Sequence, residues 1–212
     1  MVGGEHHDAL DDFGFLFGDQ PFIPQKADDV GNFITLVDEF GGGIAVVAGF
    51  FTAVVAFAKE TGVALHTEWS VNEKVACETA LANSMAGRRS VVAMKQVGLN
   101  VAADPFTRAA YLGVKGGFIL IAADDPGPHS SQTEQDSRFF AMFAKVPVLD
   151  PSSPREAKDM VAQALELSER YGLPVMVRPT TRVCHARQNV PCGAPVRLEE
   201  VAGVRNDVEN NK

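Results

Sequence analysis

The chain has 212 residues, of which 46% are hydrophobic and 22% charged, a composition typical of a soluble globular protein. Its formal net charge of -8 argues against a nucleic-acid partner, because phosphate neutralisation requires clustered Lys and Arg. No apolar run reaches the roughly 18 residues that a membrane span needs, and the N-terminus lacks the basic and apolar regions of a signal peptide. The three cysteines have no framework spacing, so we expect reduced thiols in a cytoplasmic protein.

Residues 1–42 are acidic and rich in Gly, Phe and Asp, and they show no clean hydrophobic period, so we expect an irregular arm there. From residue 43 onward, short apolar runs typical of strands alternate with helical patterns. The expected strands are 44–48, 63–69, 90–94, 117–123, 146–149 and 173–178, and the expected helices are 52–61, 71–86, 104–114, 139–144 and one that begins at Pro154. Residues 191–212 are expected to form a polar C-terminal tail.

The helix that begins at Pro154 has the clearest start and stop signals. Ser153 and Glu156 have the spacing of a capping box, and Pro154 occupies the first helical position. Gly172 follows the apolar stripe and is typical of a helix end.

The alternation of strands and helices implies βαβ units, and therefore a doubly wound, mostly parallel α/β domain over residues 43–190 with helices on both faces of the sheet. In such sheets ligands bind outside the carboxyl ends of the strands. This rule selects three loops, residues 69–72, 95–103 and 124–138, as the expected edge of a ligand site.

The first candidate is a carboxyl at the start of the helix 71–86. Ser70 and Glu73 have capping-box spacing, so Glu73 is explained if it only bonds back to the start of its helix. The functional alternative is a carboxyl held in an apolar cleft, where burial raises its pKa and the helix N-terminus lowers it. Such a group can exchange a proton with a ring nitrogen.

The other two loops hold polar residues that capping does not explain. Asp104 and Pro105 are accounted for as the start of a helix, whereas Lys95 and Asn100 are not. After the turn Asp-Pro-Gly-Pro comes a run of hydrogen-bonding side chains that includes His129 and Gln132. A solvated surface loop explains this run as well as a binding role does.

Several chemistries have no sequence support. The Gly-rich fingerprints of dinucleotide and P-loop nucleotide binding are missing, and no four-cysteine cluster suits an iron–sulfur centre. Cys184, His185 and Cys192 match no common zinc spacing, so no metal site is predicted in this chain. The Gly-Asp-Gly run that often helps to hold magnesium and a diphosphate is also missing.

Read together, the three loops resemble a known family. Glu-Trp-Ser-Val-Asn-Glu-Lys-Val-Ala (68–76), Met-Lys-Gln-Val-Gly-Leu-Asn-Val-Ala-Ala-Asp-Pro (94–105) and Asp-Asp-Pro-Gly-Pro-His-Ser-Ser-Gln-Thr-Glu-Gln-Asp-Ser-Arg (124–138) are similar to segments of the indolepyruvate:ferredoxin oxidoreductase α subunit. The resemblance covers roughly residues 54–190 and continues through Gly-Leu-Pro-Val-Met-Val-Arg-Pro-Thr-Thr-Arg-Val-Cys-His (172–185).

The resemblance implies the pyrimidine-binding domain of a thiamine diphosphate-dependent 2-oxoacid:ferredoxin oxidoreductase, which converts a 2-oxoacid to an acyl-CoA. In that family a glutamate contacts N1′ of the aminopyrimidine, and Glu73 is the position that would carry this role, with Glu68 as the second choice. The resemblance further implies that residues near the cofactor and the 2-oxoacid come from the other two loops. We expect Gly98 and Asn100 to border the cofactor, and Lys95, His129 and Gln132 to border the substrate.

The chain also departs from the family pattern. The family loop Gly-Tyr-Pro-Gly-Thr-Pro-Ser is replaced by Ala48-Gly-Phe-Phe-Thr-Ala-Val-Val55, and residues 1–47 do not resemble the family. We expect thiamine diphosphate to be shared with a separate diphosphate-binding domain or chain, and magnesium and iron–sulfur clusters to lie on domains missing here. A second oxidoreductase subunit, ferredoxin and a dimer are the expected partners.

Two alternatives are kept open at this point. The chain could be a non-catalytic α/β interaction module from a truncated or frame-altered gene, which the lost loop and the unrelated first 47 residues favour. It could also be a flavodoxin-like domain that binds another ligand at the strand ends without any need for Glu73.

Overall fold

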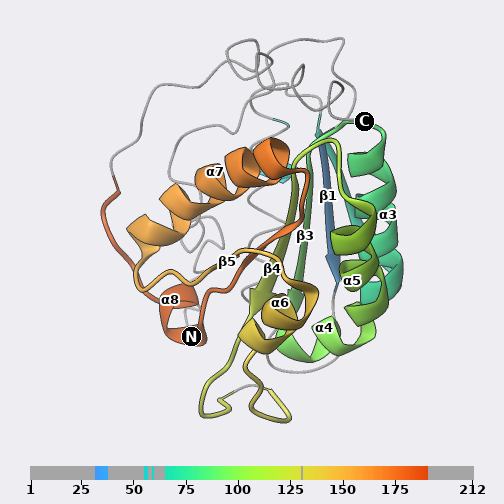
Figure 1. The fold of residues 1–212 in the computed structure, drawn as a ribbon. Helices are drawn as coiled ribbons and strands as arrows, with labels where there is room; N and C mark the ends of the chain where they lie inside the picture. Colours follow the sequence, from blue (N-terminus) through green and yellow to red (C-terminus); the bar gives the residue numbers. More distant parts are fainter. Residues whose placement is uncertain (1–31, 38–54, 57–58, 60–64, 130, 191–212) are drawn as a thin grey trace, which may run out of the picture.

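The computed structural model describes residues 32–37, 55–56, 59, 65–129 and 131–190. Within this part, six parallel strands form one sheet in the order β2-β1-β3-β4-β6-β5 (Figure 1). The strands are β1 (Asn32–Val37), β2 (Leu65–Ser70), β3 (Ser90–Lys95), β4 (Phe118–Ala123), β5 (Val148–Leu149) and β6 (Val175–Val177). The predicted parallel α/β fold is confirmed.

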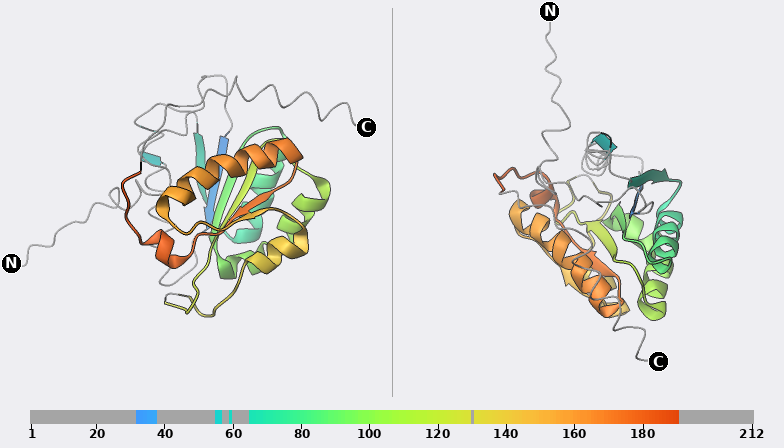
Figure 2. Two further views of the ribbon diagram at one scale, coloured as in Figure 1. Left: turned by 60° about the vertical axis from the view of Figure 1, so that its left-hand side comes forward. Right: turned by 90° about the horizontal axis from the view of Figure 1, so that it is seen from above.

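Helices cover both faces of this sheet, as Figure 2 shows. One face carries α3 (Glu73–Met85), α4 (Gln96–Val101), α5 (Ala103–Leu112) and α6 (Arg138–Ala144), and the other carries α7 (Pro154–Tyr171) and α8 (Thr181–Cys184). Alternate residues of β3 divide between the two cores, because successive strand side chains point to opposite faces. Val92 and Met94 pack with the first layer, whereas Val91 and Ala93 pack with the second.

The central strands explain why the sequence pattern is so clear. Phe118 to Ala122 of β4 are all buried, and β3 is buried from Ser90 to Met94. A parallel strand covered by helices on both faces has no solvent side, and it therefore reads as a continuous apolar run.

Helix α7 begins where the sequence predicts, although its cap differs in one contact. The Ser153 hydroxyl accepts a hydrogen bond from the Glu156 amide, as in a capping box. The Glu156 carboxylate in turn accepts from the amide and hydroxyl of Ser152, at 2.8 and 2.7 Å, and these bonds lower the pKa of Glu156. The helix ends at Gly172, whose φ of 64° is left-handed and therefore favours glycine.

Strand β1 corrects the expectation for the N-terminal arm. The segment 1–42 was expected to be irregular throughout, yet β1 lies inside it and pairs with both β2 and β3. The six residues Asn-Phe-Ile-Thr-Leu-Val do not alternate between apolar and polar, so they give no strand signal, and pairing with two neighbouring strands stabilises them in the sheet. The predicted strand 44–48, most of the predicted helix 52–61, and the tail 191–212 fall outside the described residues, so the domain division remains a prediction.

The segment 95–103 was expected to be a loop, and this was wrong, because α4 occupies most of it. Gly98 and Asn100 are poor helix formers, which hid the helix from sequence reasoning. The helix forms because Gln96, Gly98 and Leu99 are buried against the rest of the domain. No helix in the described part of the chain is long and apolar enough to cross a membrane.

Candidate functional site

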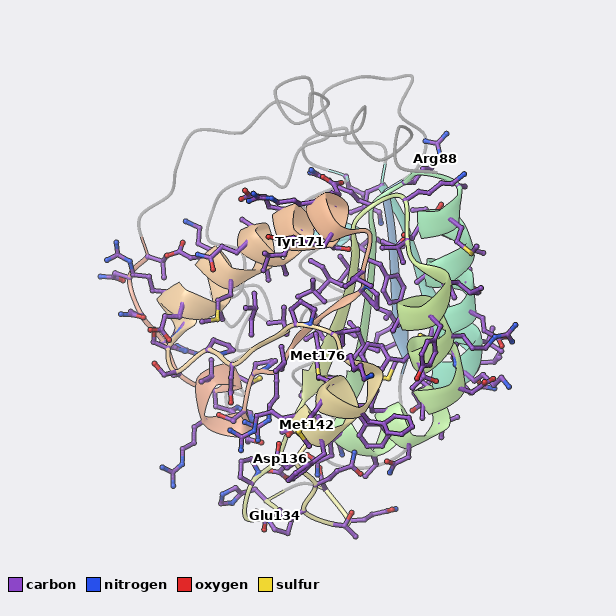
Figure 3. The ribbon with its side chains drawn as sticks, viewed as in Figure 1. Arg88, Glu134, Asp136, Met142, Tyr171 and Met176 are labelled. Atoms are coloured by element: carbon purple, nitrogen blue, oxygen red, sulfur yellow. The ribbon has the colours of Figure 1, made fainter. Side chains whose placement is uncertain are left out.

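Three strand ends meet at one edge of the sheet and bring the candidate segments together. The parallel register places Lys95 at the end of β3 beside Ala123 at the end of β4. Helices α3 and α4 follow β2 and β3 at this edge, and a loop follows β4. In Figure 3, Glu134 and Asp136 of that loop lie at the opposite end of the molecule from Arg88, which precedes β3. This carboxyl edge is therefore the one at which the sequence places a ligand site.

The start of α3 does not have the capping box that the sequence suggests. Ser70 is the last residue of β2, and the N-cap is Asn72, whose side-chain oxygen accepts a 2.9 Å hydrogen bond from the Val75 amide. Glu73 is therefore the first helical residue, not the third, which a capping box requires. Its side chain is only 4% exposed. The capping account no longer explains Glu73, so its burial needs another reason.

The Glu73 side chain packs directly against Gly98 of α4. A β-carbon built at position 98 would lie 2.5 Å from Glu73 Cγ and 2.6 Å from Oε1, which is closer than real contacts of this kind. Gly98 is itself buried. Only glycine leaves room for the carboxyl at this place, so α4 forms a wall against which the Glu73 carboxyl is held.

The base of the loop after β4 is fixed by a buried ion pair. Asp124 Oδ2 lies 2.6 Å from Arg178 Nε, and both residues are buried. The same carboxylate accepts hydrogen bonds from the amide and the hydroxyl of Ser137, at the far end of the loop. Arg178 also donates to both carboxylate oxygens of Asp150, at 3.2 and 3.0 Å. One arginine therefore joins the carboxyl ends of β4, β5 and β6.

The neighbouring Asp125 organises the inside of the loop. Its Oδ2 accepts hydrogen bonds from the amides of His129 and Ser131, at 2.9 and 3.0 Å. Its Oδ1 accepts from the hydroxyl of Thr181 at 2.7 Å. A buried carboxylate that accepts several hydrogen bonds fixes the backbone around it, so the turn leading to His129 has a defined shape.

Gln96, the first residue of α4, connects that helix to the loop. Its side-chain nitrogen donates to the Thr133 carbonyl at 2.7 Å, and its side-chain oxygen accepts from the Asp125 amide. The backbone carbonyl of Gln96 accepts from the side chain of Gln135 at 2.8 Å. The loop and the wall behind Glu73 are thus parts of one hydrogen-bonded unit.

Of the residues predicted for the cofactor side, the structure brings Glu73 and Gly98 into contact. Asn100 lies on the same helix as Gly98, but its side chain is exposed. Glu68, the second choice for the catalytic carboxyl, lies on β2, and its Oε2 is 3.2 Å from His66 Nε2. Glu68 is part-exposed, unlike Glu73, so Glu73 is the better candidate.

Of the residues predicted for the substrate side, Lys95 lies at the junction of β3 and α4 and is half-buried. His129 and Gln132 are exposed on the loop, so the structure does not bury them with Glu73. They lie at the same edge of the sheet, within the segment that Asp125 and Gln96 hold in place.

Sequence reasoning missed Gln96, Asp124 and Arg178. A usable signal was present for the two charged residues, because each follows a run of buried apolar residues directly. A charge at the end of a buried strand is costly unless it is paired. For Gln96 the sequence offered no comparable signal, because glutamine is an ordinary helix residue.

The outer side of the loop carries a second, more exposed ion pair. Arg138 donates from Nε and Nη2 to the two carboxylate oxygens of Asp136, at 2.8 and 2.7 Å. These hydrogen bonds are the main reason why the pKa of Asp136 is lowered to about 2, and they raise the pKa of Arg138. The residues that the structure describes include no group of three or more His, Cys, Asp or Glu side chains that could hold a metal ion.

Comparison with known proteins agrees with the resemblance seen in the sequence. No protein-family model matches the chain. The chain is similar to indolepyruvate oxidoreductase subunit IorA of Pyrococcus horikoshii, with 56% identity over 144 residues that make up 68% of this chain and 22% of that protein. It is also similar to subunit IorA of Archaeoglobus fulgidus, with 52% identity over 128 residues, 60% of this chain and 20% of that protein.

A solved structure shares the fold. The 2-oxoglutarate:ferredoxin oxidoreductase from Magnetococcus marinus, with 2-oxoglutarate, coenzyme A and succinyl-CoA bound, aligns with a TM-score of 0.60 and 19% identity over 84% of this chain and 29% of that chain. The chain spans only about a fifth of the length of the curated relatives that it matches. Over the aligned part, this chain is similar in sequence to indolepyruvate oxidoreductase IorA subunits, at 50–56% identity.

Proposed function

We propose that the described domain is the pyrimidine-binding part of a thiamine diphosphate-dependent 2-oxoacid:ferredoxin oxidoreductase that acts on an arylpyruvate such as indolepyruvate. The whole enzyme would decarboxylate the 2-oxoacid oxidatively and form an acyl-CoA. The observation that carries the proposal is the Glu73 carboxyl, which is buried at the carboxyl edge and packed against Gly98. The relatives are named indolepyruvate oxidoreductase subunits, which supports the substrate class for the family.

The residues around Glu73 fit the pyrimidine half of this cofactor. When bound, thiamine diphosphate would supply the carbon nucleophile and electron sink that 2-oxoacid decarboxylation requires. Glu73 would hold the N1′ nitrogen of the pyrimidine by a hydrogen bond, and its carboxyl would share or exchange a proton at that atom. Gly98 keeps the space that the carboxyl occupies, and Asn100 of the same helix is proposed to border the cofactor.

The substrate would lie between this carboxyl and the loop after β4. Lys95 is proposed to face the carboxylate of the 2-oxoacid, because a cation is the natural partner of that group. His129 and Gln132 are proposed to contact the substrate from the loop, where they are exposed and therefore accessible. The loop base is fixed by Asp124 and Asp125, so these side chains extend from a defined backbone.

The proposal requires a complementary domain or chain that binds the diphosphate with magnesium. The surface of α6 supports such a contact, because Phe139, Met142 and Phe143 are 63%, 67% and 71% exposed. Their spacing places them on one face of the helix, and clustered exposed apolar side chains are typical of a surface covered by another protein. We assign this surface to the diphosphate-binding domain because α6 begins where the site loop ends. A second subunit, ferredoxin and a dimer remain further proposals.

The test is cofactor binding by the chain co-expressed with its diphosphate-binding partner. Titration calorimetry with thiamine diphosphate and magnesium should show binding to the wild-type complex. Glu73→Gln preserves shape but removes the exchangeable carboxyl proton, and it should lower 2-oxoacid turnover by about 10²–10⁴-fold. Glu68→Gln, the same change on β2, is the matched control and should retain turnover.

Two results would count against the proposal. One is the lack of magnesium-dependent cofactor binding by the complex, and the other is equal turnover by wild type and Glu73→Gln. Assembly with the partner in the absence of cofactor binding would favour the alternative, a non-catalytic interaction module.

A further inference from the structure

Gln96 is the fully buried amide side chain at the first position of α4. Burying an amide is unfavourable unless its donor and acceptor are both bonded. A helix of this kind needs no glutamine at its start, since many residues form helices equally well. The burial therefore indicates a specific role for the bonds that Gln96 makes.

The bonds of Gln96 reach two separate stretches of the loop after β4. Its side-chain oxygen accepts from the amide of Asp125 at the start of the loop. Its side-chain nitrogen donates to the carbonyl of Thr133, and its backbone carbonyl accepts from Gln135, both near the end of the loop. One residue thus ties both ends of the loop to the same helix turn.

The same helix turn also contacts the candidate catalytic carboxyl. Gly98 follows Gln96 by two residues and packs against Glu73 at a distance that leaves no room for a β-carbon. Gln96 and Gly98 are both buried, so a shift of α4 would disturb either the loop contacts of Gln96 or the contact of Gly98 with Glu73. Helix α4 therefore connects the Glu73 carboxyl on one side with the loop on the other.

We propose that Gln96 is a positioning residue that sets where the loop, with His129 and Gln132, lies relative to the Glu73 carboxyl. It does so by holding residues 125 and 133 against α4, and it touches neither substrate nor cofactor. The catalytic consequence rests on the function proposed above, whereas the mechanical link between α4 and the loop does not. Loss of the link should affect substrate binding and leave cofactor binding in place, because the loop is released while Gly98 of α4 still packs against Glu73.

The mechanical link is tested by hydrogen–deuterium exchange on the full chain carrying Gln96→Glu. Glutamate keeps an acceptor for the Asp125 amide but places an oxygen opposite the Thr133 carbonyl, so one hydrogen bond becomes a repulsion. Amides of the segment 125–135 should exchange at least about 10-fold faster, because the variant replaces a hydrogen bond by a repulsion and places a carboxyl at a buried position. Gln163→Glu on the exposed side of α7 is the matched control and should leave that segment unchanged.

A second variant covers the case in which Gln96→Glu fails to fold. Gln135→Ala removes one bond to α4 from the part-exposed side and leaves the Gln96 side chain intact. It should accelerate exchange in the same segment by a smaller factor. Exchange in 125–135 that equals the wild-type rate in every variant that folds would overturn the link.

The catalytic consequence is tested in the complex with the diphosphate-binding partner. Gln96→Glu should raise the KM for the 2-oxoacid about tenfold or more, while thiamine diphosphate affinity stays within about twofold of wild type. A loss of cofactor affinity as large as that of Glu73→Gln, or an unchanged KM, would overturn the positioning role. If the wild-type complex binds no cofactor, the proposed function fails, and the exchange measurement still decides the link.

Discussion

Gly98 lies so close to Glu73 that a β-carbon at position 98 would come within 2.6 Å of the Glu73 Oε1 atom. The carboxyl and α4 therefore cannot both keep their places if position 98 gains a side chain. This makes Gly98→Ala a sharp probe of the proposed site, since it adds one methyl group and alters no charge.

Gly98→Ala should displace the Glu73 carboxyl or push α4 outward. Overpacking of this kind typically costs about 1–3 kcal/mol of stability, and the displaced carboxyl should weaken cofactor binding in the complex. Urea unfolding and calorimetry measure the two effects. Gly127→Ala is the control for cofactor binding, because a β-carbon there meets nothing within 4 Å; its φ of 66° should cost some stability without touching Glu73. If Gly98→Ala binds the cofactor as well as wild type does, then Gly98 is not part of the cofactor site.

The ion pair of Arg178 and Asp124 should be costly to break. Arg178→Met removes the cation but leaves the Asp124 carboxylate buried beside Ser137. Removing one partner of a buried pair typically costs about 3–5 kcal/mol, because the remaining charge is uncompensated. Urea unfolding at neutral pH should show a loss of this size.

The double variant Arg178→Met with Asp124→Asn supplies the control. It removes the orphaned charge, so it should recover part of the lost stability. If the double variant is no more stable than Arg178→Met, then the uncompensated carboxylate is not the cause of the loss.

The contribution of the Asp136 carboxyl to the free energy of unfolding should decrease at acid pH. Its hydrogen bonds from Arg138 hold its folded pKa at about 2, below the ordinary value of 3.8. A lowered folded pKa contributes stability that is present above the ordinary value and is lost as the pH falls toward the folded value. The difference in unfolding free energy between wild type and Asp136→Asn should therefore be constant near neutral pH and shrink between about pH 4 and pH 2.

Urea unfolding of both proteins at pH 6, 4 and 3 measures this difference. A difference at pH 3 as large as that at pH 6 would contradict the assigned cause, because the wild-type carboxyl would then be gaining nothing from its ionised form.

The exposed face of α6 should matter for assembly and little for the fold. Phe143 is 71% exposed, so Phe143→Ser should change the stability of the chain itself by no more than about 0.5 kcal/mol. Association with the diphosphate-binding partner should weaken by about tenfold or more, as when an aromatic interface residue is truncated. Tyr171→Ser is the control, because Tyr171 is also exposed but lies on α7, away from Met142 of α6 (Figure 3). An equal loss of association in Phe143→Ser and Tyr171→Ser would contradict the assignment of the α6 face to the partner.

The sequence was sufficient for the two central strands and for the longest helix. Strands β3 and β4 and helix α7 carry their patterns in consecutive residues, so periodicity and capping located them within a few positions. Strand β1 was missed because its six residues depend on their neighbours in the sheet, which the local sequence does not reveal.

The sequence predicted the location of the candidate site better than it predicted the contacts within the site. Topology located the carboxyl edge, and the resemblance selected Glu73, which the structure buries. The capping box at Ser70 was wrong because Asn72 is the N-cap and α3 starts at Glu73, and spacing alone cannot tell which of two polar residues becomes the cap. The hydrogen bonds of Gln96 join residues far apart in the chain, so no local sequence pattern could have predicted them.

The hydrogen bonds of Gln96 have a consequence for how the domain folds. They join residues 29, 37 and 39 positions apart, and their geometry exists only when β3 and β4 lie side by side in register. Two parallel strands can pair only after the long connection between them has been ordered, which costs entropy. Parallel pairing therefore comes later in folding than the formation of local helices. We therefore expect the contacts between Gln96 and the loop to form late in folding, after β3 and β4 have paired.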